Sequence, residues 1–167
     1  MAAVTNDKVK KIGVIGTRGT IGSHAYKNKI NKKNSKIKVF EVACPLFVPL
    51  IEEGELKGKL IEILTETYLN SLKKLKVDTL ILGCTHYPLI KPEIAKQMGL
   101  KVRIVDSGKE TARKLSEYLR TQKILATNKR KPDEKYYVTD LTDRFVEVAE
   151  MFLGESIAGK IRKISFK

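Results

Sequence analysis

Between residues 9 and 120, apolar residues occur in two patterns, as short continuous runs and as repeats at helical spacing. Four short apolar runs have the length of buried strands and fall at residues 11–16, 37–43, 79–82 and 102–105. Between and after them, apolar residues recur at helical spacing and predict helices at residues 21–30, 56–75, 92–98 and 107–120. Thr20 and Ser107 are expected to cap the first and the last of these helices. This order of elements predicts an α/β fold with a doubly wound parallel sheet.

The last part of the chain carries a second, smaller pattern. Residues 121–135 are polar and lack a regular period, which predicts a surface connection. A strand, a helix with Thr142 as its cap and a last strand are then expected at residues 136–139, 142–153 and 161–166. One strand-helix-strand unit is too small to enclose a core, so we expect it to complete a sheet supplied from elsewhere.

Composition limits the classes of protein to which the chain can belong. Its 167 residues, 42% of them apolar, suffice for one domain with a core and a little more. No apolar run approaches the ~18 residues that a membrane span needs, and the first residues do not form a secretory signal. Two cysteines forty residues apart suit neither a disulfide framework nor a zinc site. We therefore expect a cytoplasmic protein without a membrane partner and without a bound metal.

The formal net charge of +14 is concentrated near the start of the chain. Residues 1–40 contain ten lysines or arginines and a single acidic residue, Asp7. A nucleic-acid surface is one interpretation. The lysines are spread over a strand edge, a helix and a loop, however, and no aromatic residues are interleaved for base stacking. A lysine-rich composition with a bias toward acidic ligands is the favoured interpretation, and no nucleic-acid partner is expected.

The strongest chemical signal is the segment DTLILGCTHYPLIKPE at residues 78–93. Its apolar run predicts a buried strand, after which Gly83 lets the backbone turn. Groups just beyond the carboxyl end of a buried strand line the ligand crevice of an α/β fold. A thiol, a hydroxyl, an imidazole and a phenol follow there in consecutive positions, at Cys84, Thr85, His86 and Tyr87. A thiolate at Cys84, helped by His86 and by backbone N–H groups, could attack an electrophile or take a proton from carbon.

The first strand-to-helix turn offers a second group of polar atoms. Glycines recur at every third position from Gly13 to Gly22, but their spacing is not that of a dinucleotide fingerprint or a P-loop. The hydroxyls of Thr17 and Thr20, with backbone N–H groups at a helix start, could form an anion pocket. A simple tight turn with a cap is an equally good interpretation.

The segment EVACPLFVPLIEEGE contributes a second cysteine and two carboxylates. Cys44 has apolar neighbours and is expected to be a buried, inert thiol. Glu52 and Glu53 end this loop, and a solvated acidic pair is the usual case, although either could approach the crevice. His24, on the first helix, is expected to be structural or exposed.

Three long motifs, IGVIGTRGTI, ACPLFVPLIEEG and LILGCTHYPL, occur in this order along the chain. Together they closely resemble the glutamate racemases of the aspartate/glutamate racemase superfamily. The resemblance covers about residues 9–167 and includes the trailing YYVTD and FLG segments. It implies an enzyme that interconverts L- and D-glutamate without a cofactor and thereby supplies D-glutamate for peptidoglycan.

The resemblance also implies roles for individual residues. In that family, two cysteines flank the α-carbon of the substrate: one thiolate removes the α-proton, and the other cysteine delivers a proton to the opposite face. The second of these cysteines falls on Cys84, and the thiol-assisting histidine falls on His86. Glu52 matches an acidic residue near that side of the site. The family's substrate-binding hydroxyls fall on Thr85, Thr17 and Thr20.

One departure from the family pattern bears on activity. Members begin with a segment that carries an Asp-Ser pair and, later, a Cys-Asn-Thr turn with the first catalytic cysteine. This sequence starts after both, and Cys44 falls on the family's non-catalytic ACP turn. The chain then corresponds to one complete racemase domain at residues 9–108 and the C-terminal part of the other at residues 109–167.

The missing segment leads to three expectations. Because one thiol reaches only one face of a carbon centre, we expect that the chain alone does not racemise glutamate. An incomplete sheet exposes apolar surface, so poor solubility or a homodimer is expected. A non-catalytic module that binds small acids and a basic nucleic-acid-binding domain are the alternative functions.

Overall fold

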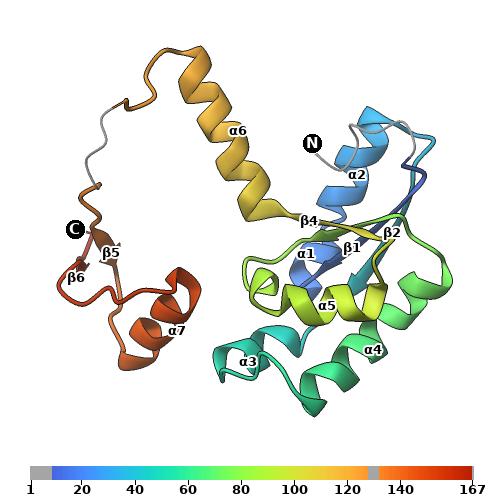
Figure 1. Ribbon diagram of the computed structural model, residues 1–167, viewed down its shortest axis with the longest axis horizontal. Helices are drawn as coiled ribbons and strands as arrows, with labels where there is room; N and C mark the ends of the chain where they lie inside the picture. The colour runs from blue at the N-terminus through green and yellow to red at the C-terminus, as the bar shows by residue number, and fades with distance from the viewer. Residues whose placement is uncertain (1–8, 128–131, 167) are drawn as a thin grey trace. The chain divides into compact units, whose positions relative to one another are not determined.

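The computed structural model describes residues 9–127 and 132–166, and the chain forms two compact units, Met1–Ile124 and Leu125–Lys167. The first unit contains a four-stranded parallel sheet in the order β2-β1-β3-β4 (Figure 1). Its strands are β1 (Lys11–Gly16), β2 (Lys38–Ala43), β3 (Thr79–Leu82) and β4 (Arg103–Asp106). Within the described residues, no helix combines the length and apolar character needed to cross a membrane.

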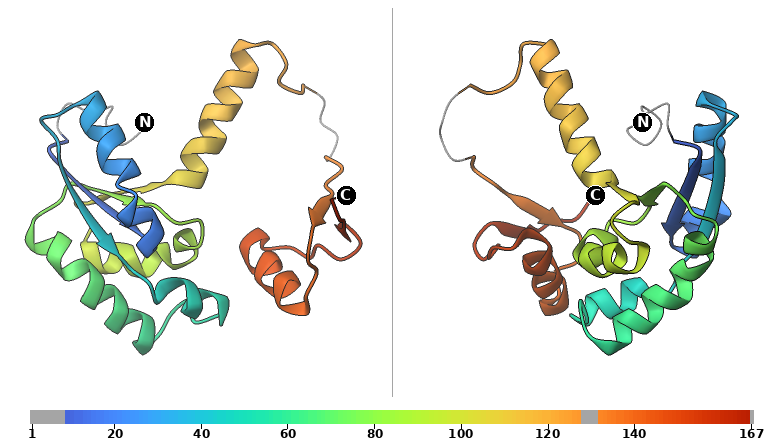
Figure 2. Two further views of the ribbon diagram at one scale, coloured as in Figure 1. Left: turned by 180° about the vertical axis from the view of Figure 1, so that it is seen from behind. Right: turned by 45° about the vertical axis from the view of Figure 1, so that its right-hand side comes forward.

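Helices cover both faces of this sheet (Figures 1 and 2). One face packs against α1 (Arg18–Gly22) and α2 (Ala25–Lys33), with Ile30 buried among Ile12, Val14 and Ile81. The other face packs against α3 (Phe47–Glu52), α4 (Lys59–Lys74), the 3-10 helix η2 (Tyr87–Ile90) and α5 (Lys91–Met98). Strand residues alternate between these two cores, as the period of a strand requires. The predicted α/β fold with a doubly wound parallel sheet is confirmed.

The predicted helix at residues 21–30 is wrong in detail, because the chain forms two short helices there. His24 takes a left-handed backbone conformation with φ of 51° and separates α1 from α2. Thr17, not Thr20, is the N-cap of α1, since its side chain accepts a hydrogen bond from the backbone N–H of Thr20. The last helix of the first unit, α6 (Ser107–Thr121), is likewise capped by Asp106 and not by Ser107.

The second unit contains the expected strand-helix-strand unit. Strands β5 (Tyr136–Val138) and β6 (Ile161–Lys163) pair in parallel, and α7 (Asp143–Leu153) lies between them in the chain. Thr142 caps α7 by accepting a hydrogen bond of 3.1 Å from the N–H of Phe145. No residue of α7 is buried, which agrees with a unit too small to enclose its own core.

Helix α6 belongs by its contacts to the first compact unit. The domain boundary predicted from the sequence, after residue 108, instead assigns nearly all of α6 to the other racemase domain. The compact units are defined by contacts within this chain. The two racemase domains are instead those of a full-length family member. The assignment of residues 109–167 to the other racemase domain stays a prediction.

Candidate active site

The turns that follow β1 and β3 lie against each other at the carboxyl edge of the sheet. The backbone N–H of Gly83 donates a hydrogen bond of 2.7 Å to the carbonyl oxygen of Ile15. A Cβ atom on Gly83 would lie only 2.7 Å from that oxygen, so a larger residue does not fit without movement of the backbone. The same point lies 3.6 Å from a methyl carbon of Thr20. This close approach places the turn that carries Cys84 beside the turn that carries Thr17 and Thr20.

His86 connects the partly buried thiol of Cys84 with a carboxylate from another part of the chain. Its Nδ1 atom lies 3.9 Å from Sγ of Cys84 and 3.3 Å from Oγ1 of Thr85. Its Nε2 atom lies 3.1 Å from Oε1 of Glu52. The structure thus brings together Cys84, Thr85, His86 and Glu52, and Glu52 is one of the two carboxylates that the sequence left as alternatives.

This arrangement defines a direction for proton transfer. A carboxylate is an acceptor, so the contact with Glu52 favours the tautomer of His86 that carries a proton on Nε2. Nδ1 is then free of its proton and turns its lone pair toward Sγ of Cys84 and Oγ1 of Thr85. His86 can take the thiol proton and return it, while Glu52 stabilises the imidazolium formed in between. The side chains of His86 and Glu52 are 23% and 45% exposed, so solvent reaches both of them.

Tyr87 has a structural role in positioning this group. The expectation that its phenol lines the crevice is wrong, because Tyr87 is fully buried and its hydroxyl donates a hydrogen bond of 3.0 Å to the carbonyl oxygen of Cys44. Its ring also packs edge-on against Phe47 of α3, with the ring centres 5.3 Å apart. Loss of solvent is the main cause that raises the pKa of Tyr87, followed by the nearby Cys44 thiol. Tyr87 therefore joins η2 to the helix that carries Glu52.

Cys44 is confirmed as a buried thiol. Its side chain is fully buried, and its Sγ atom lies 3.8 Å from the carbonyl oxygen of Val42. Burial raises the pKa of the Cys44 thiol to about 12, which keeps it protonated at neutral pH. His24 is confirmed as exposed, with a hydrogen bond of 2.7 Å from Nδ1 to the Glu41 carboxylate.

Thr17 and Thr20 form the capped turn that was one of the two interpretations of this segment. Their Oγ1 atoms lie 3.1 Å apart, and the backbone N–H of Thr20 donates to Oγ1 of Thr17 at 3.3 Å. Thr17 follows the last residue of β1, and the Thr20 side chain lies beside Gly83. Their predicted role in holding substrate carboxylates stays a prediction.

Sequence reasoning gave Ser107 only a capping role. Its hydroxyl instead donates a hydrogen bond of 3.0 Å to the carbonyl oxygen of Leu82, the last residue of β3. The turn after β4 is thereby fixed beside the turn that holds Cys84. The signal in the sequence was a serine just beyond an apolar run. Across residues 9–127 and 132–166, no group of three or more His, Cys, Asp and Glu side chains is arranged to hold a metal ion.

Residues 1–115 match the family described as Asp/Glu/Hydantoin racemase. The chain belongs to this family. Among curated members, it is 42% identical over 166 residues to glutamate racemase from Geobacter metallireducens, covering 99% of this chain and 60% of that protein. It is 43% identical over 156 residues to glutamate racemase from Lactiplantibacillus plantarum, covering 92% of this chain and 57% of that protein.

Solved structures of racemases share the fold. Glutamate racemase from Francisella tularensis, in complex with D-glutamate, aligns with a TM-score of 0.87 and 39% identity over 98% of this chain and 61% of that chain. Glutamate racemase isoform RacE1 from Bacillus anthracis aligns with a TM-score of 0.88 and 36% identity. The alignment covers 99% of this chain and 61% of that chain. This racemase-family chain therefore spans about three fifths of the length of the relatives that it matches.

Proposed function

We propose that this chain is a portion of a glutamate racemase in which Cys84 transfers a proton at one face of the α-carbon of glutamate. The observation that carries this proposal is the row of Cys84, His86 and Glu52 at the carboxyl edge of the sheet. Membership of the racemase family and 42% identity to a glutamate racemase support glutamate as the substrate. The reaction is proposed to occur in the cytoplasm and to supply D-glutamate for peptidoglycan.

The chemistry follows from the proton path. His86 takes the proton of Cys84, and the resulting thiolate removes the α-proton of the bound amino acid; in the reverse direction, the Cys84 thiol gives a proton to the carbanion. The α-proton is very weakly acidic, so hydrogen-bond donors must stabilise the charge that develops on the substrate carboxylate. We assign this role to hydroxyls that stand at the same edge, those of Thr85, Thr17 and Thr20. No cofactor is required by this scheme.

We further propose that the chain alone does not racemise glutamate. Inversion of a carbon centre needs an acid and a base on opposite faces, and Cys84 serves one of them. Cys44 is unsuited to serve the other, because its thiol is fully buried and burial raises its pKa to about 12. In the described part of the chain, cavities of 220, 390 and 420 Å³ are lined by other residues than Cys84. A second wall with a second thiol would therefore come from polypeptide outside this chain.

A homodimer is part of the same proposal. Helix α6 has no buried residue, and its residues Leu115 and Tyr118, one turn apart, are 54% and 58% exposed. An apolar stripe of this kind on a helix is a usual contact surface between protein chains. Sedimentation velocity of the purified chain tests the dimer, and a Leu115→Glu/Tyr118→Glu variant is expected to be monomeric.

Complementation tests the proposed activity. The purified chain would be mixed with the part of the Geobacter metallireducens racemase that it does not match, and conversion of L- to D-glutamate followed by circular dichroism. We expect no conversion by either part alone, conversion by the mixture, and none when the chain carries Cys84→Ala. Binding of glutamate without conversion by the mixture would instead favour a non-catalytic binding module. Conversion by the chain alone, lost on Cys84→Ala, would contradict the proposed half-site.

A further inference from the structure

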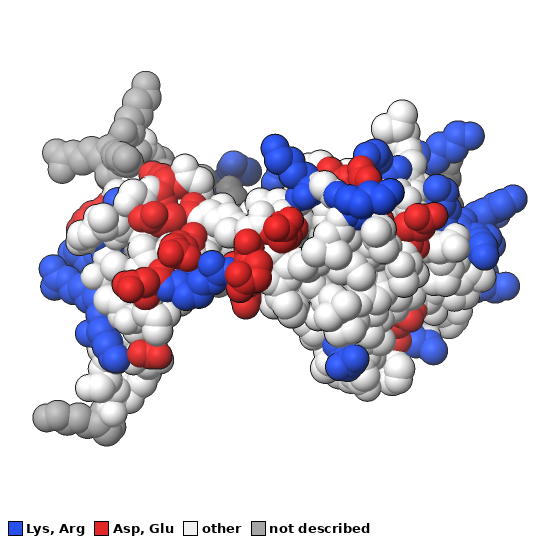
Figure 3. Space-filling view, turned by 90° about the horizontal axis from the view of Figure 1, so that it is seen from below, with Lys and Arg blue, Asp and Glu red and all other residues white. Residues whose placement is uncertain are grey.

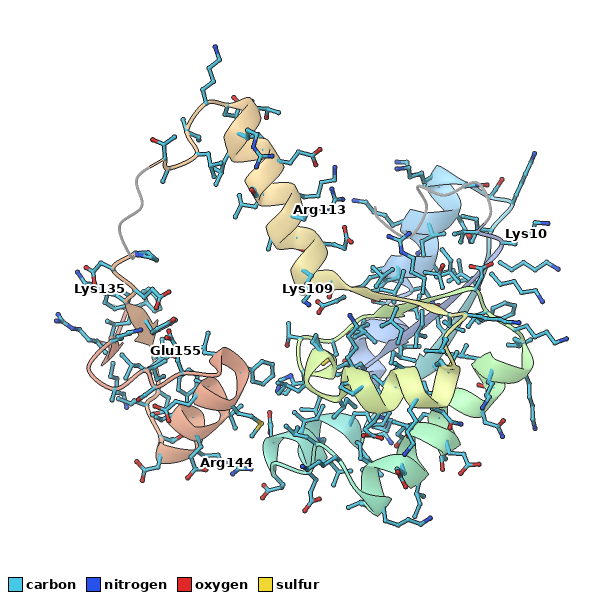
Figure 4. All side chains as sticks on the ribbon, in the orientation of Figure 1. Lys10, Lys109, Arg113, Lys135, Arg144 and Glu155 are labelled. Atoms are coloured by element: carbon cyan, nitrogen blue, oxygen red, sulfur yellow. The ribbon has the colours of Figure 1, made fainter. Side chains whose placement is uncertain are left out.

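The amino edge of the sheet, opposite the candidate active site, is strongly basic. The strands are parallel, so all four begin at this edge. Basic residues occur at or just before the strand starts, at Lys10, Lys11, Lys36, Lys38, Lys76, Lys101 and Arg103. In the space-filling view, Lys and Arg side chains gather at the right-hand end of the first unit (Figure 3). Figure 4 labels Lys10 at this end and Lys109 at the start of α6, beyond the carboxyl end of β4.

A cavity of about 420 Å³ opens at this edge. Its lining residues come from the starts of β1 and β2 and from the loop before β2, and they are Val9, Lys10, Lys11, Asn34, Lys36, Ile37 and Lys38. Four of these seven residues are lysines and none is acidic. A hollow with this lining attracts an anion both by its charge and by its shape.

The backbone around the cavity is held by defined hydrogen bonds. The N–H of Lys38 donates to the carbonyl oxygen of Lys10 at 2.9 Å, next to the paired positions Lys11 and Lys38 of the two strands. On the loop side, the N–H of Lys36 donates to Oδ1 of Asn34 at 3.0 Å. The lysine stems therefore start from fixed points, and only their flexible ends must adjust to a ligand.

Among the residues that the structure describes, the lysine side chains of the cavity form no ion pair with a carboxylate. Ion pairs within the described part of the chain involve other lysines and arginines than those of the cavity. Asp78 is the nearby acidic residue, and its Oδ2 atom accepts hydrogen bonds of 2.8 and 2.9 Å from the backbone N–H groups of Lys10 and Lys11. Nζ of Lys11 donates to the carbonyl oxygen of Leu75 at 2.9 Å. Lys10, Lys36 and Lys38 thus add like charges to the lining of one cavity, which favours the binding of an anion there.

We propose that this cavity binds an organic anion that carries phosphate groups on an apolar body. The ammonium groups of the lining lysines match phosphate oxygens, and Val9 and Ile37 with the lysine stems provide apolar surface. The volume of 420 Å³ lies within the range of roughly 300–1,000 Å³ that is usual for small-molecule sites. The lining contains no aromatic side chain on which nucleic-acid bases could stack. A small phosphorylated molecule therefore fits these residues better than a long nucleic acid, and this site is independent of the proposed racemase activity.

Calorimetric titration of the full chain with ADP, in buffer of low salt without magnesium, tests this proposal. ADP is expected to bind, pyrophosphate to bind about tenfold more weakly because it lacks the apolar body, and adenosine not to bind. The Lys36→Glu/Lys38→Glu variant should lose about tenfold or more in ADP affinity. The matched control Lys29→Glu/Lys57→Glu makes the same change of charge outside the cavity lining and should bind ADP as the parent does.

Thermal unfolding of each variant shows whether it is folded. If the Lys36→Glu/Lys38→Glu variant is unfolded, the Lys36→Gln/Lys38→Gln variant takes its place in the titration. Three results would overturn the proposal: absence of ADP binding at about 1 mM ligand, equal affinity in the cavity variant and the parent, or equal affinity for ADP and pyrophosphate. Displacement of ADP from the parent by a short DNA duplex at lower concentration would also overturn it and would indicate a nucleic-acid surface.

Discussion

Nε2 of His86 lies 3.1 Å from Oε1 of Glu52, although 34 positions separate the two residues in the chain. Glu52 is the last residue of α3, and His86 precedes η2, so two separate turns of the carboxyl edge must meet for this contact to form. The contact favours the tautomer with a proton on Nε2, and in the proposed reaction this leaves Nδ1 to accept a proton from Cys84. In the proposed reaction, Glu52 acts through His86 and is a positioning residue.

Replacing Glu52 with glutamine should slow racemisation by the complemented protein. The amide can still contact Nε2 but no longer stabilises the imidazolium, so we expect kcat to fall by about tenfold or more while KM changes little. The neighbouring variant Glu53→Gln is the matched control and should retain the parental kcat. Equal values of kcat for Glu52→Gln and the parent would show that Glu52 does not support proton transfer.

The two cysteines should differ sharply in reactivity toward iodoacetamide. Cys84 is partly exposed, whereas Cys44 is fully buried and burial raises its pKa to about 12. Because the thiolate is the reactive form, alkylation of the folded chain near pH 8 should modify Cys84 alone. Peptide mass spectrometry measures both sites, and unfolding in urea should make Cys44 react as well. Modification of Cys44 in the folded chain at the rate of Cys84 would contradict its burial.

The Tyr87 hydroxyl should contribute measurably to stability. Tyr87→Phe removes the donor to the buried carbonyl oxygen of Cys44, which should lower the free energy of unfolding by about 1–3 kcal/mol. Urea denaturation measures this change. Tyr137→Phe, at an exposed position of β5, makes the same chemical change and should leave the stability nearly unchanged. A loss equally large in the control would mean that the buried hydrogen bond is not the cause.

Alkaline pH should destabilise the chain partly through Cys44. Its pKa in the folded state is raised from 9.0 to about 12, so the folded state holds the proton more tightly than the unfolded state. The resulting stabilisation is complete below pH 9.0 and is lost as pH rises toward about 12. The free energy of unfolding should therefore fall less steeply over this window in Cys44→Ala than in the parent. Parallel curves for the two proteins would contradict the raised pKa.

The sheet and the Cys84 turn could be predicted because their signals are local. Each buried strand is a short apolar run, and Gly83 and the polar residues after it mark where β3 ends. The residue that caps α1 could not be predicted in the same way. Thr17 and Thr20 are both good capping residues, and the exact end of β1 decides between them.

The features that depend on distant contacts could not be predicted. Helix α3 lies between Pro45 and Glu53 in a segment that looks like a loop, and its helical phase decides which of two adjacent carboxylates meets His86. Tyr87 looked like a crevice residue because its neighbours are polar. Its burial follows from a hydrogen bond to a residue 43 positions away, for which the sequence carries no local signal.

Deuterium incorporation tests most directly whether Cys84 transfers the α-proton. L-glutamate would be incubated in D2O with the complemented protein, and deuterium at the α-carbon of the D-glutamate formed would be followed by NMR. We predict one deuterium at the α-carbon of the D-glutamate formed with the parental chain. With Cys84→Ala, we predict that no D-glutamate forms. Formation of deuterated D-glutamate at the parental rate by the Cys84→Ala protein would contradict it.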